Sequence, residues 1–248
     1  MINQVTDAEP TDSLWSSLYT IGGAAALFGV AMIPVQLFVF ITWPPPDTAL
    51  GWFALFQSNK LAGLLAFEGL FVVNAVFGIA TTLALYVALR RFDESWMAIA
   101  LGLGLLEAVA FIAARPAMEM LFLSDQYAAA TTEAQKALLL AAGEAQWATF
   151  HGTAFHVGYN IFSIYFLIVP LVMLRSNIFG KVTVFTGILA ALLNWGLYVP
   201  GLGLYLSILS VFPLALWDIL VARKLFQLGR GKVSPLEGLP QIRLERAN

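Results

Sequence analysis

Long apolar runs separated by short polar connections dominate this chain. A helix needs about 20 apolar residues to cross about 30 Å of hydrocarbon, and six stretches of the sequence meet that requirement. To within a few residues they cover 16–42, 61–89, 96–122, 147–174, 182–199 and 202–222. The pattern therefore predicts an all-α, polytopic transmembrane bundle of six helices.

The same pattern divides the chain into three parts. Residues 1–15 form a polar N-terminal tail, residues 16–226 the six-helix transmembrane domain, and residues 227–248 a basic, flexible C-terminal tail. The N-terminal tail contains no lysine or arginine. Because the first apolar run is too long for the core of a signal peptide, we interpret it as an uncleaved first span.

Basic residues are concentrated in the connections on one side of the predicted bundle. With the N-terminus in the cytoplasm, the cytoplasmic side receives most of the 13 lysines and arginines. These residues are Arg90, Arg91, Arg175, Lys181, Arg223, Lys224, Arg230, Lys232, Arg243 and Arg246. The outer side receives Lys60 and Lys136, while Arg115 lies within a span. Since positively charged loops tend to stay in the cytoplasm, we predict that both termini are cytoplasmic.

The first outer connection is long and rich in aromatic residues. The segment Trp43–Asp47 contains three successive prolines, which end the first span abruptly. Trp52, Phe53 and Phe56 follow, and aromatic side chains favour the membrane–water interface. This segment predicts a short interfacial helix in the outer loop.

The second outer connection, residues 124–146, has a helical periodicity of its own. Thr132 and Gln135 have the spacing of a capping box at the start of a helix. The apolar positions that follow recur at helical spacing, opposite three charged residues. They are Ala134, Ala137, Leu138, Ala141 and Ala145, opposite Glu133, Lys136 and Glu144. The pattern predicts an amphipathic helix on the outer surface, which serves either as a connector or as a lid over an outward-facing pocket.

The composition agrees with lipid as the main surroundings of this chain. Hydrophobic residues make up 60% and charged residues 11% of the sequence, about half the charged fraction of a soluble domain. The chain contains no cysteine, which excludes disulfides, cysteine-ligated iron–sulfur clusters, thioether-attached haem and thiol nucleophiles. The only basic cluster lies beside a membrane span, so we predict no nucleic-acid partner.

A small set of polar side chains lies within or next to the predicted spans. Ionisable groups are costly in hydrocarbon, and they tend to mark functional positions. The candidate ligand-binding residues are Glu68, Asn74, Glu107, Arg115, Glu119, His151, Thr153, His156, Asn160 and Asn194. Counted at about 1.5 Å per residue from the cytoplasmic ends, they fall in the middle and outer half of the membrane. This distribution predicts a polar pocket that opens to the outside.

The fourth span carries a polar stripe. Thr149, Thr153, His156, Asn160 and Ser163 follow one another at spacings of three and four residues, which places all five on one helix face. Such a stripe is expected to face other helices or water. It serves either as polar contact between helices or as the wall of a ligand site.

The remaining ionisable residues need partners of opposite charge. Arg115 and Glu119 have the i,i+4 spacing of an ion pair within one helix, although Pro116 between them loosens that helix. Glu68 and Glu107 have no cation on their own helices. We therefore expect Arg115 or one of the two histidines to pair with them, or the carboxyl groups to be protonated.

Several specific chemistries lack the residues that they need. His151 and His156 are five residues apart on one helix, which fits neither a bis-histidine haem nor an i,i+4 zinc pair. No lysine lies near mid-membrane, so a retinal-type Schiff base has no point of attachment. We therefore predict no metal site and no cofactor, and the sequence identifies no catalytic residue.

The turn between the fourth and fifth spans carries a family resemblance. The segment 174–187 resembles a signature of a bacterial polytopic membrane family known only as a domain of unknown function, with Tyr-Arg-Ser, then Pro-Arg, then two glycines three residues apart. Arg175, Ser176 and Gly187 match that signature, Lys181 is a basic replacement, and Leu174, Gly180 and Val184 depart from it. The resemblance implies a small multi-helix bacterial membrane protein, and it implies no reaction.

The leading hypothesis is an integral protein of the bacterial cytoplasmic membrane that binds a small amphipathic ligand, such as a lipid, quinone or pigment, or that acts as an accessory subunit. One alternative is an intramembrane enzyme in which Glu68 or Glu107 works as acid or base beside His156. Another is a small-molecule transporter. The expected partners are the lipid bilayer, a lipid-like ligand, and other membrane subunits or further copies of this chain.

Overall fold

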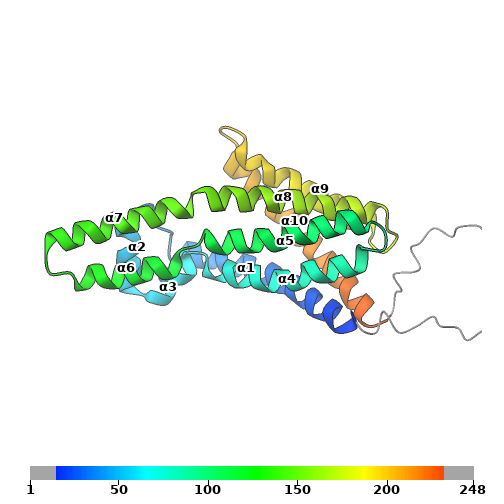
Figure 1. Cartoon of the computed structure of the whole chain (residues 1–248), viewed down its shortest axis with the longest axis horizontal. Helices are drawn as coiled ribbons and strands as arrows, with labels where there is room; N and C mark the ends of the chain where they lie inside the picture. The colour runs from blue at the N-terminus through cyan, green and yellow to red at the C-terminus, as the bar shows by residue number, and fades with distance from the viewer. Residues whose placement is uncertain (1–14, 232–248) are drawn as a thin grey trace, which may run out of the picture. The chain divides into compact units, whose positions relative to one another are not determined.

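The computed structural model describes residues 15–231, which are helical almost throughout (Figure 1). In chain order the elements are α1 (Ser16–Thr42), α2 (Ala49–Ser58), α3 (Lys60–Ala66), α4 (Gly69–Leu89), α5 (Glu94–Ala113), α6 (Ala117–Ala129), α7 (Glu133–Phe150), α8 (Thr153–Leu174), α9 (Lys181–Trp195), the 3-10 helix η2 (Gly196–Tyr198) and α10 (Gly203–Gly229). No strand occurs within these residues, which confirms the predicted all-α class. The tail positions 1–14 and 232–248 lie outside the described residues.

Six stretches of residues 15–231 are long and apolar enough to cross a membrane, as the hydropathy pattern predicts. They are Ser16–Thr42, Gly69–Leu89, Glu94–Ala129, Glu133–Leu174, Lys181–Tyr198 and Gly203–Gly229. The chain is therefore a multi-pass, membrane-type helical protein. Its last span is longer than predicted, because α10 continues to Gly229 and so includes the first residues of the expected C-terminal tail.

The chain forms two compact units, each assembled from separate parts of the sequence. Within the described residues, the first unit contains 15–24, 80–101 and 166–231, and the second contains 25–79 and 102–165. Of the ten candidate ligand-binding residues, Asn194 lies in the first unit and the other nine lie in the second.

A glycine allows close packing of α8, α9 and α10 in the first unit. A Cβ atom on Gly187 of α9 would lie 2.5 Å from Cγ of Pro170 and 2.6 Å from Nε1 of Trp217. The ring of Trp217 is 1% exposed, and its centroid is 4.6 Å from that of Phe166. A proline ring and a buried indole leave no flexible atoms that could move aside.

We predict that Gly187→Ala lowers the free energy of unfolding by about 1–3 kcal/mol, because the added methyl group overpacks this contact. Thermal unfolding of the detergent-solubilised chain measures the change. Gly102→Ala is the matched control, since a Cβ on that helical glycine meets nothing within 4 Å. That control should leave stability unchanged or raise it by up to about 1 kcal/mol. Equal effects of the two substitutions would show that the packing at Gly187 is looser than described.

Two polar turns of the first unit meet, as the six-span arrangement requires. Nη1 of Arg175, in the turn after α8, donates a hydrogen bond to Oδ2 of Asp93, in the turn before α5. The guanidinium of Arg90 lies over the rings of Trp15 and Tyr86, at 5.9 and 5.8 Å from their centroids. Connections that follow the second and fourth spans must lie on one side of a membrane, and these contacts agree with that requirement.

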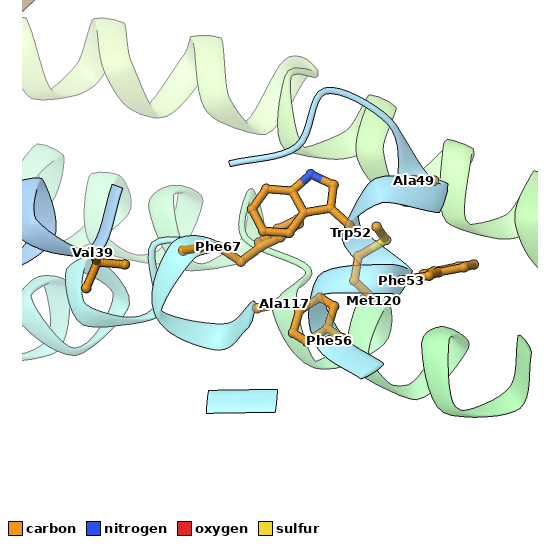
Figure 2. Packing of buried hydrophobic residues seen from close by; sticks show 9 residues of the cluster. Val39, Ala49, Trp52, Phe53, Phe56, Phe67, Ala117 and Met120 are labelled. Atoms are coloured by element: carbon orange, nitrogen blue, oxygen red, sulfur yellow. The ribbon is translucent and has the colours of Figure 1, made fainter. Parts of the chain in front are cut away.

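In the second unit, α2, α3, α6 and α7 pack together as a helical cap with an apolar core of its own (Figure 2). Trp52, Phe53 and Phe56 of α2 and the adjacent Phe67 are at most 1% exposed, and Met120 of α6 is fully buried. The ring centroids of Trp52 and Phe67 are 4.6 Å apart in an edge-to-face contact. The short helix predicted around Trp52 is present as α2, but its aromatic side chains form this core instead of facing a membrane interface.

The connection between α6 and α7 is much shorter than the predicted loop. α6 continues to Ala129 and α7 begins at Glu133, so residues 130–132 alone connect them. The backbone N–H of Gln135 donates to Oγ1 of Thr132 at 3.2 Å, which confirms the predicted helix start. The two helices run side by side in Figure 1 and contact each other.

The face of α7 that packs within the helical cap is not the predicted apolar stripe. Leu140, Trp147 and Phe150 pack against the cap core, and Gly143 is buried. A Cβ on Gly143 would lie 2.6 Å from Cζ of Phe53, so the absence of a side chain permits this approach. The predicted stripe, Ala134, Ala137, Leu138, Ala141 and Ala145, is exposed. Alanine-rich positions supply little apolar area, whereas the aromatic residues of the other face supply much more.

Candidate functional site at three helix breaks

Three of the predicted spans are interrupted within the second unit. The first interruption, between α3 and α4, lies at Phe67–Glu68. The second, between α5 and α6, lies at Ala114–Pro116, and the third, between α7 and α8, lies at His151–Gly152. These three short segments form the break cluster. The spans predicted across them are therefore discontinuous, which corrects the sequence analysis.

Three long helices begin or end at the break cluster. α4 and α8 begin there and α5 ends there, and they contain 21, 22 and 20 residues. At 1.5 Å per residue these helices are about 30–33 Å long. Since the hydrocarbon core is about 30 Å thick, each of them is long enough to cross it.

Glu68 forms the first break. Its backbone has φ +64°, a left-handed conformation that is unfavourable for a side chain of this kind. The turn ends α3 at Ala66 and starts α4 at Gly69. Gln36 of α1, which is 1% exposed, donates from Nε2 to the carbonyl oxygen of Leu65 at 3.1 Å. This carbonyl group also accepts from the backbone N–H of Glu68 at 3.2 Å, so the side chain of Gln36 adds a second hydrogen bond at the end of α3.

Pro116 causes the second break. Proline has no N–H and its ring clashes with the preceding turn, so α5 ends at Ala113 and α6 begins at Ala117. The backbone N–H of Arg115 donates to the carbonyl oxygen of Ile112 at 3.0 Å, which tightens the last turn. This geometry leaves Arg115 in a short non-helical segment between two helices.

His151 and Gly152 form the third break. Nδ1 of His151 hydrogen-bonds with the carbonyl oxygen of Trp147 at 3.2 Å, and its ring centroid is 4.3 Å from that of Trp147. Because a carbonyl oxygen only accepts, this hydrogen bond places a proton on Nδ1. α8 begins at Thr153, and the N–H of His156 donates to the carbonyl oxygen of Gly152 at 3.2 Å. His151 therefore acts as a cap for α7.

The side chain of Arg115, itself in the second break, contacts the first break and two rings that flank the third. Its Nε donates to Oε2 of Glu68 at 2.7 Å, across the first and second breaks. Its Cζ lies 4.0 Å from the ring centroid of Phe111, 4.9 Å from that of Phe150 and 5.5 Å from that of Phe155. Phe150 ends α7 and Phe155 lies in the first turn of α8, so these two rings flank the third break. A cation among aromatic faces is stabilised by their quadrupoles.

The guanidinium of Arg115 is enclosed, but it is not fully hydrogen-bonded. The side chain of Arg115 is 4% exposed, and that of Glu68 is 22% exposed. Nη1 of Arg115 is buried without a hydrogen-bond partner among the described residues, as are Oε1 of Gln36 and Nε1 of Trp52. Buried polar atoms are rarely left unpaired in proteins, so these atoms are candidates for contact with a further polar group.

The ion pair predicted between Arg115 and Glu119 is replaced by another. Arg115 pairs with Glu68, and Glu119 is exposed on α6. The break at Pro116 removes the continuous helix that an i,i+4 pair needs. The expectation that Arg115 would serve Glu68 or Glu107 is confirmed for Glu68, and the charge of Arg115 also acts on Glu107.

The polar stripe predicted on the fourth span is divided by the third break. Thr149 belongs to α7, whereas Thr153, His156, Asn160 and Ser163 belong to α8. Thr153 and His156 are exposed and Ser163 is fully buried. Nδ2 of Asn160 donates to the backbone carbonyl of His156 at 2.8 Å. The stripe therefore does not form one continuous wall.

Two further candidate residues, Asn74 and Asn194, lie at other places in the fold. Asn74 lies against α1, where a Cβ on Gly29 would be 3.0 Å from its Oδ1, and Asn194 is buried in the first unit. The acid–base alternative requires Glu68 or Glu107 beside His156. The carboxylate of Glu68 instead accepts a hydrogen bond from Arg115.

Sequence reasoning missed the residues that enclose Arg115. Phe111 is four residues before Arg115, a spacing that brings side chains together at the end of a helix. Phe150 and Phe155 flank Gly152, and only the folded chain shows that they face the same guanidinium. The one local signal was Pro116, which directly follows Arg115 and marks the break.

The chain matches the profile of a protein family over residues 17–223. The description of that family is "domain of unknown function (DUF4386)", and because the match covers most of the sequence, the chain belongs to this family. The matched region includes the whole break cluster, and it confirms the resemblance to a membrane family of unknown function. Neither a curated protein nor a solved structure matches the chain.

Proposed function

We propose that this member of the DUF4386 family binds a small amphipathic ligand, such as a lipid or quinone, at the break cluster. The observation that carries the proposal is the meeting of three interrupted helices at one buried guanidinium, Arg115. Interrupted helices in membrane proteins are tolerated where the non-helical backbone is buried in protein or lines a cavity, and they often surround a bound substrate.

The lengths of the helices that meet at the break cluster support an amphipathic ligand. α4 and α8 begin there and α5 ends there, and each is long enough to cross the hydrocarbon core, so a molecule bound there would have its polar group at the hydrocarbon boundary and its apolar part along the spans. In the predicted orientation, with both termini in the cytoplasm, that boundary is the outer one of a bacterial cytoplasmic membrane. The helical cap then lies on the outer side.

Native mass spectrometry of the chain purified in mild detergent tests the proposal. We expect bound amphipathic molecules in the spectrum, and we expect their complete removal to lower the unfolding temperature. Adding the extracted molecules back should restore it, because a ligand that binds the folded state stabilises that state. Identical masses and unfolding temperatures before and after delipidation would contradict the proposal.

Transport of the same ligand is a second candidate, and it needs the ligand site to open to both sides of the membrane. Vesicles that contain the purified chain separate the two functions. A transporter moves the ligand from one leaflet or compartment to the other, whereas a binding protein leaves its distribution unchanged.

A further inference from the structure

We infer that Arg115 binds an anionic group, a phosphate or carboxylate carried by the amphipathic ligand. In the absence of ligand, the carboxylate of Glu68 occupies this anion site, and the anionic group of the ligand displaces it. The inference rests on the proposed function, because it names the chemistry of the ligand and the residue that closes its site. Four observations lead to it.

The first observation is the difference in exposure between the two partners. The side chain of Arg115 is 4% exposed, whereas that of Glu68 is 22% exposed. Glu68 is therefore the member of the pair that surrounding molecules reach first. Moving its carboxylate away uncovers Nε of Arg115, the atom to which it is hydrogen-bonded at 2.7 Å.

The second observation is the unused donor capacity of the guanidinium. Nη1 of Arg115 is buried without a described hydrogen-bond partner, and the one described hydrogen bond of its side chain runs from Nε to Glu68. A guanidinium presents its N–H groups in a planar fork that matches two oxygens of a phosphate or carboxylate. An external anion can use donors that the single contact with Glu68 leaves free.

The third observation is the backbone of Glu68. Its φ of +64° is unfavourable for this residue. The same residue forms the turn between α3 and α4, and its carboxylate accepts the hydrogen bond from Arg115. Strained backbone of this kind is concentrated at ligand clamps and switch segments. The N–H of Glu68 donates to the carbonyl oxygen of Leu65 at 3.2 Å, and the carbonyl oxygen of Glu68 accepts from Phe71 at 2.9 Å, so the carboxylate can leave Arg115 while these backbone hydrogen bonds keep the turn.

The fourth observation excludes a cation as the ligand. The aromatic faces of Phe111, Phe150 and Phe155 are turned to the guanidinium of Arg115 itself. A second cation at this place would meet an enclosed positive charge.

Competition binding on the full chain in detergent tests this inference. The probes are phosphatidylglycerol, phosphatidylcholine with the same acyl chains, and inorganic phosphate. The variants are Glu68→Gln, Arg115→Gln and Arg115→Lys, where the lysine variant keeps the charge and loses the planar fork. Two substitutions in the exposed ion pair Lys60–Asp125 of the helical cap serve as matched controls. Lys60→Gln removes a cation and Asp125→Asn removes a carboxylate, and neither residue has a described contact with Arg115.

We expect the chain to prefer phosphatidylglycerol over phosphatidylcholine. Glu68→Gln should raise the affinity for phosphatidylglycerol by about tenfold, because it replaces a charged competitor with a weaker neutral one. Both Arg115 variants should lower that affinity, and Lys60→Gln and Asp125→Asn should leave it unchanged. If Arg115→Gln fails to fold, Arg115→Lys and Glu68→Gln still decide the question.

The remaining outcomes separate this inference from the proposed function. If both lipids bind equally and Glu68→Gln has no effect, the inference of an anion site is wrong, whereas the proposal of an amphipathic ligand still holds. Absence of binding by either lipid in every variant overturns both. Displacement of phosphatidylglycerol by inorganic phosphate at equal concentration supports the anion site and overturns the amphipathic ligand.

Discussion

Replacing Arg115 with glutamine should lower the free energy of unfolding by about 3 kcal/mol or more. The substitution leaves the Glu68 carboxylate, only 22% exposed, without its partner, and an unpaired charge in such surroundings is costly. It also removes a cation from three aromatic faces, of which the nearest, that of Phe111, is 4.0 Å from Cζ. Because Arg115 contacts Glu68 in the first break and the rings of Phe150 and Phe155 beside the third, the loss affects the ends of several helices.

Thermal unfolding in a neutral detergent, followed by intrinsic fluorescence, measures this effect. Lys60→Gln is the control, since it deletes a cation whose side chain is 58% exposed in a surface ion pair. Pairs of that kind contribute about 0–1 kcal/mol, so the control should differ little from the unchanged chain. If the two variants unfold at the same temperature, Arg115 does not hold the break cluster together.

Replacing Trp52 with alanine should unfold the helical cap, while α4, α5, α8, α9 and α10 persist. Trp52 is 1% exposed and contacts the rings of Phe67, Trp147 and Phe56, with centroids 4.6, 5.8 and 6.2 Å away. Truncation of a buried tryptophan costs about 3–5 kcal/mol. The cap is small and has its own core, so a loss of that size should exceed its local stability.

Hydrogen exchange measured by mass spectrometry locates the change. Peptides from α2, α3 and α7 should lose protection in the Trp52 variant, whereas peptides from α4 and α9 should keep it. Leu138→Ala on α7 is the matched control, because it removes an apolar side chain that is 73% exposed. Unchanged protection of α2 in the Trp52 variant would show that the cap is held by something other than its aromatic core.

Hydropathy was sufficient to predict the helical class and the six spans, because a 20-residue apolar requirement is imposed by the bilayer itself. The local start of α7 was also predictable, since Thr132 and Gln135 interact over a short sequence distance. The position of the polar groups in the middle and outer half of the membrane, obtained by counting residues along the spans, stays a prediction. The helical class and the spans depend on the lipid solvent, and the start of α7 depends on residues that are close together in the sequence.

The partner of Arg115 could not be predicted from spacing. The i,i+4 rule gives Glu119 for a continuous helix, and Pro116 ends that helix. The actual partner, Glu68, is 47 residues away in the sequence, and its approach depends on a left-handed turn. A single sequence shows that a proline is present, but it does not show which distant turn will lie opposite the break.

The packing face of α7 was unpredictable for a related reason. Its two faces are both apolar, one rich in alanine and the other containing Leu140, Trp147 and Phe150. Periodicity detects an apolar stripe, whereas the choice between two stripes depends on the surface opposite. Here Gly143 allows Phe53 to approach, which decides in favour of the aromatic face.

The most direct test of the anion site is a structure of the full chain in nanodiscs that contain phosphatidylglycerol. We predict headgroup density within about 2.7–3.2 Å of Nη1 of Arg115, with the carboxylate of Glu68 turned away. A structure at saturating lipid in which Glu68 still accepts the 2.7 Å hydrogen bond from Arg115, with no density at Nη1, would contradict the account.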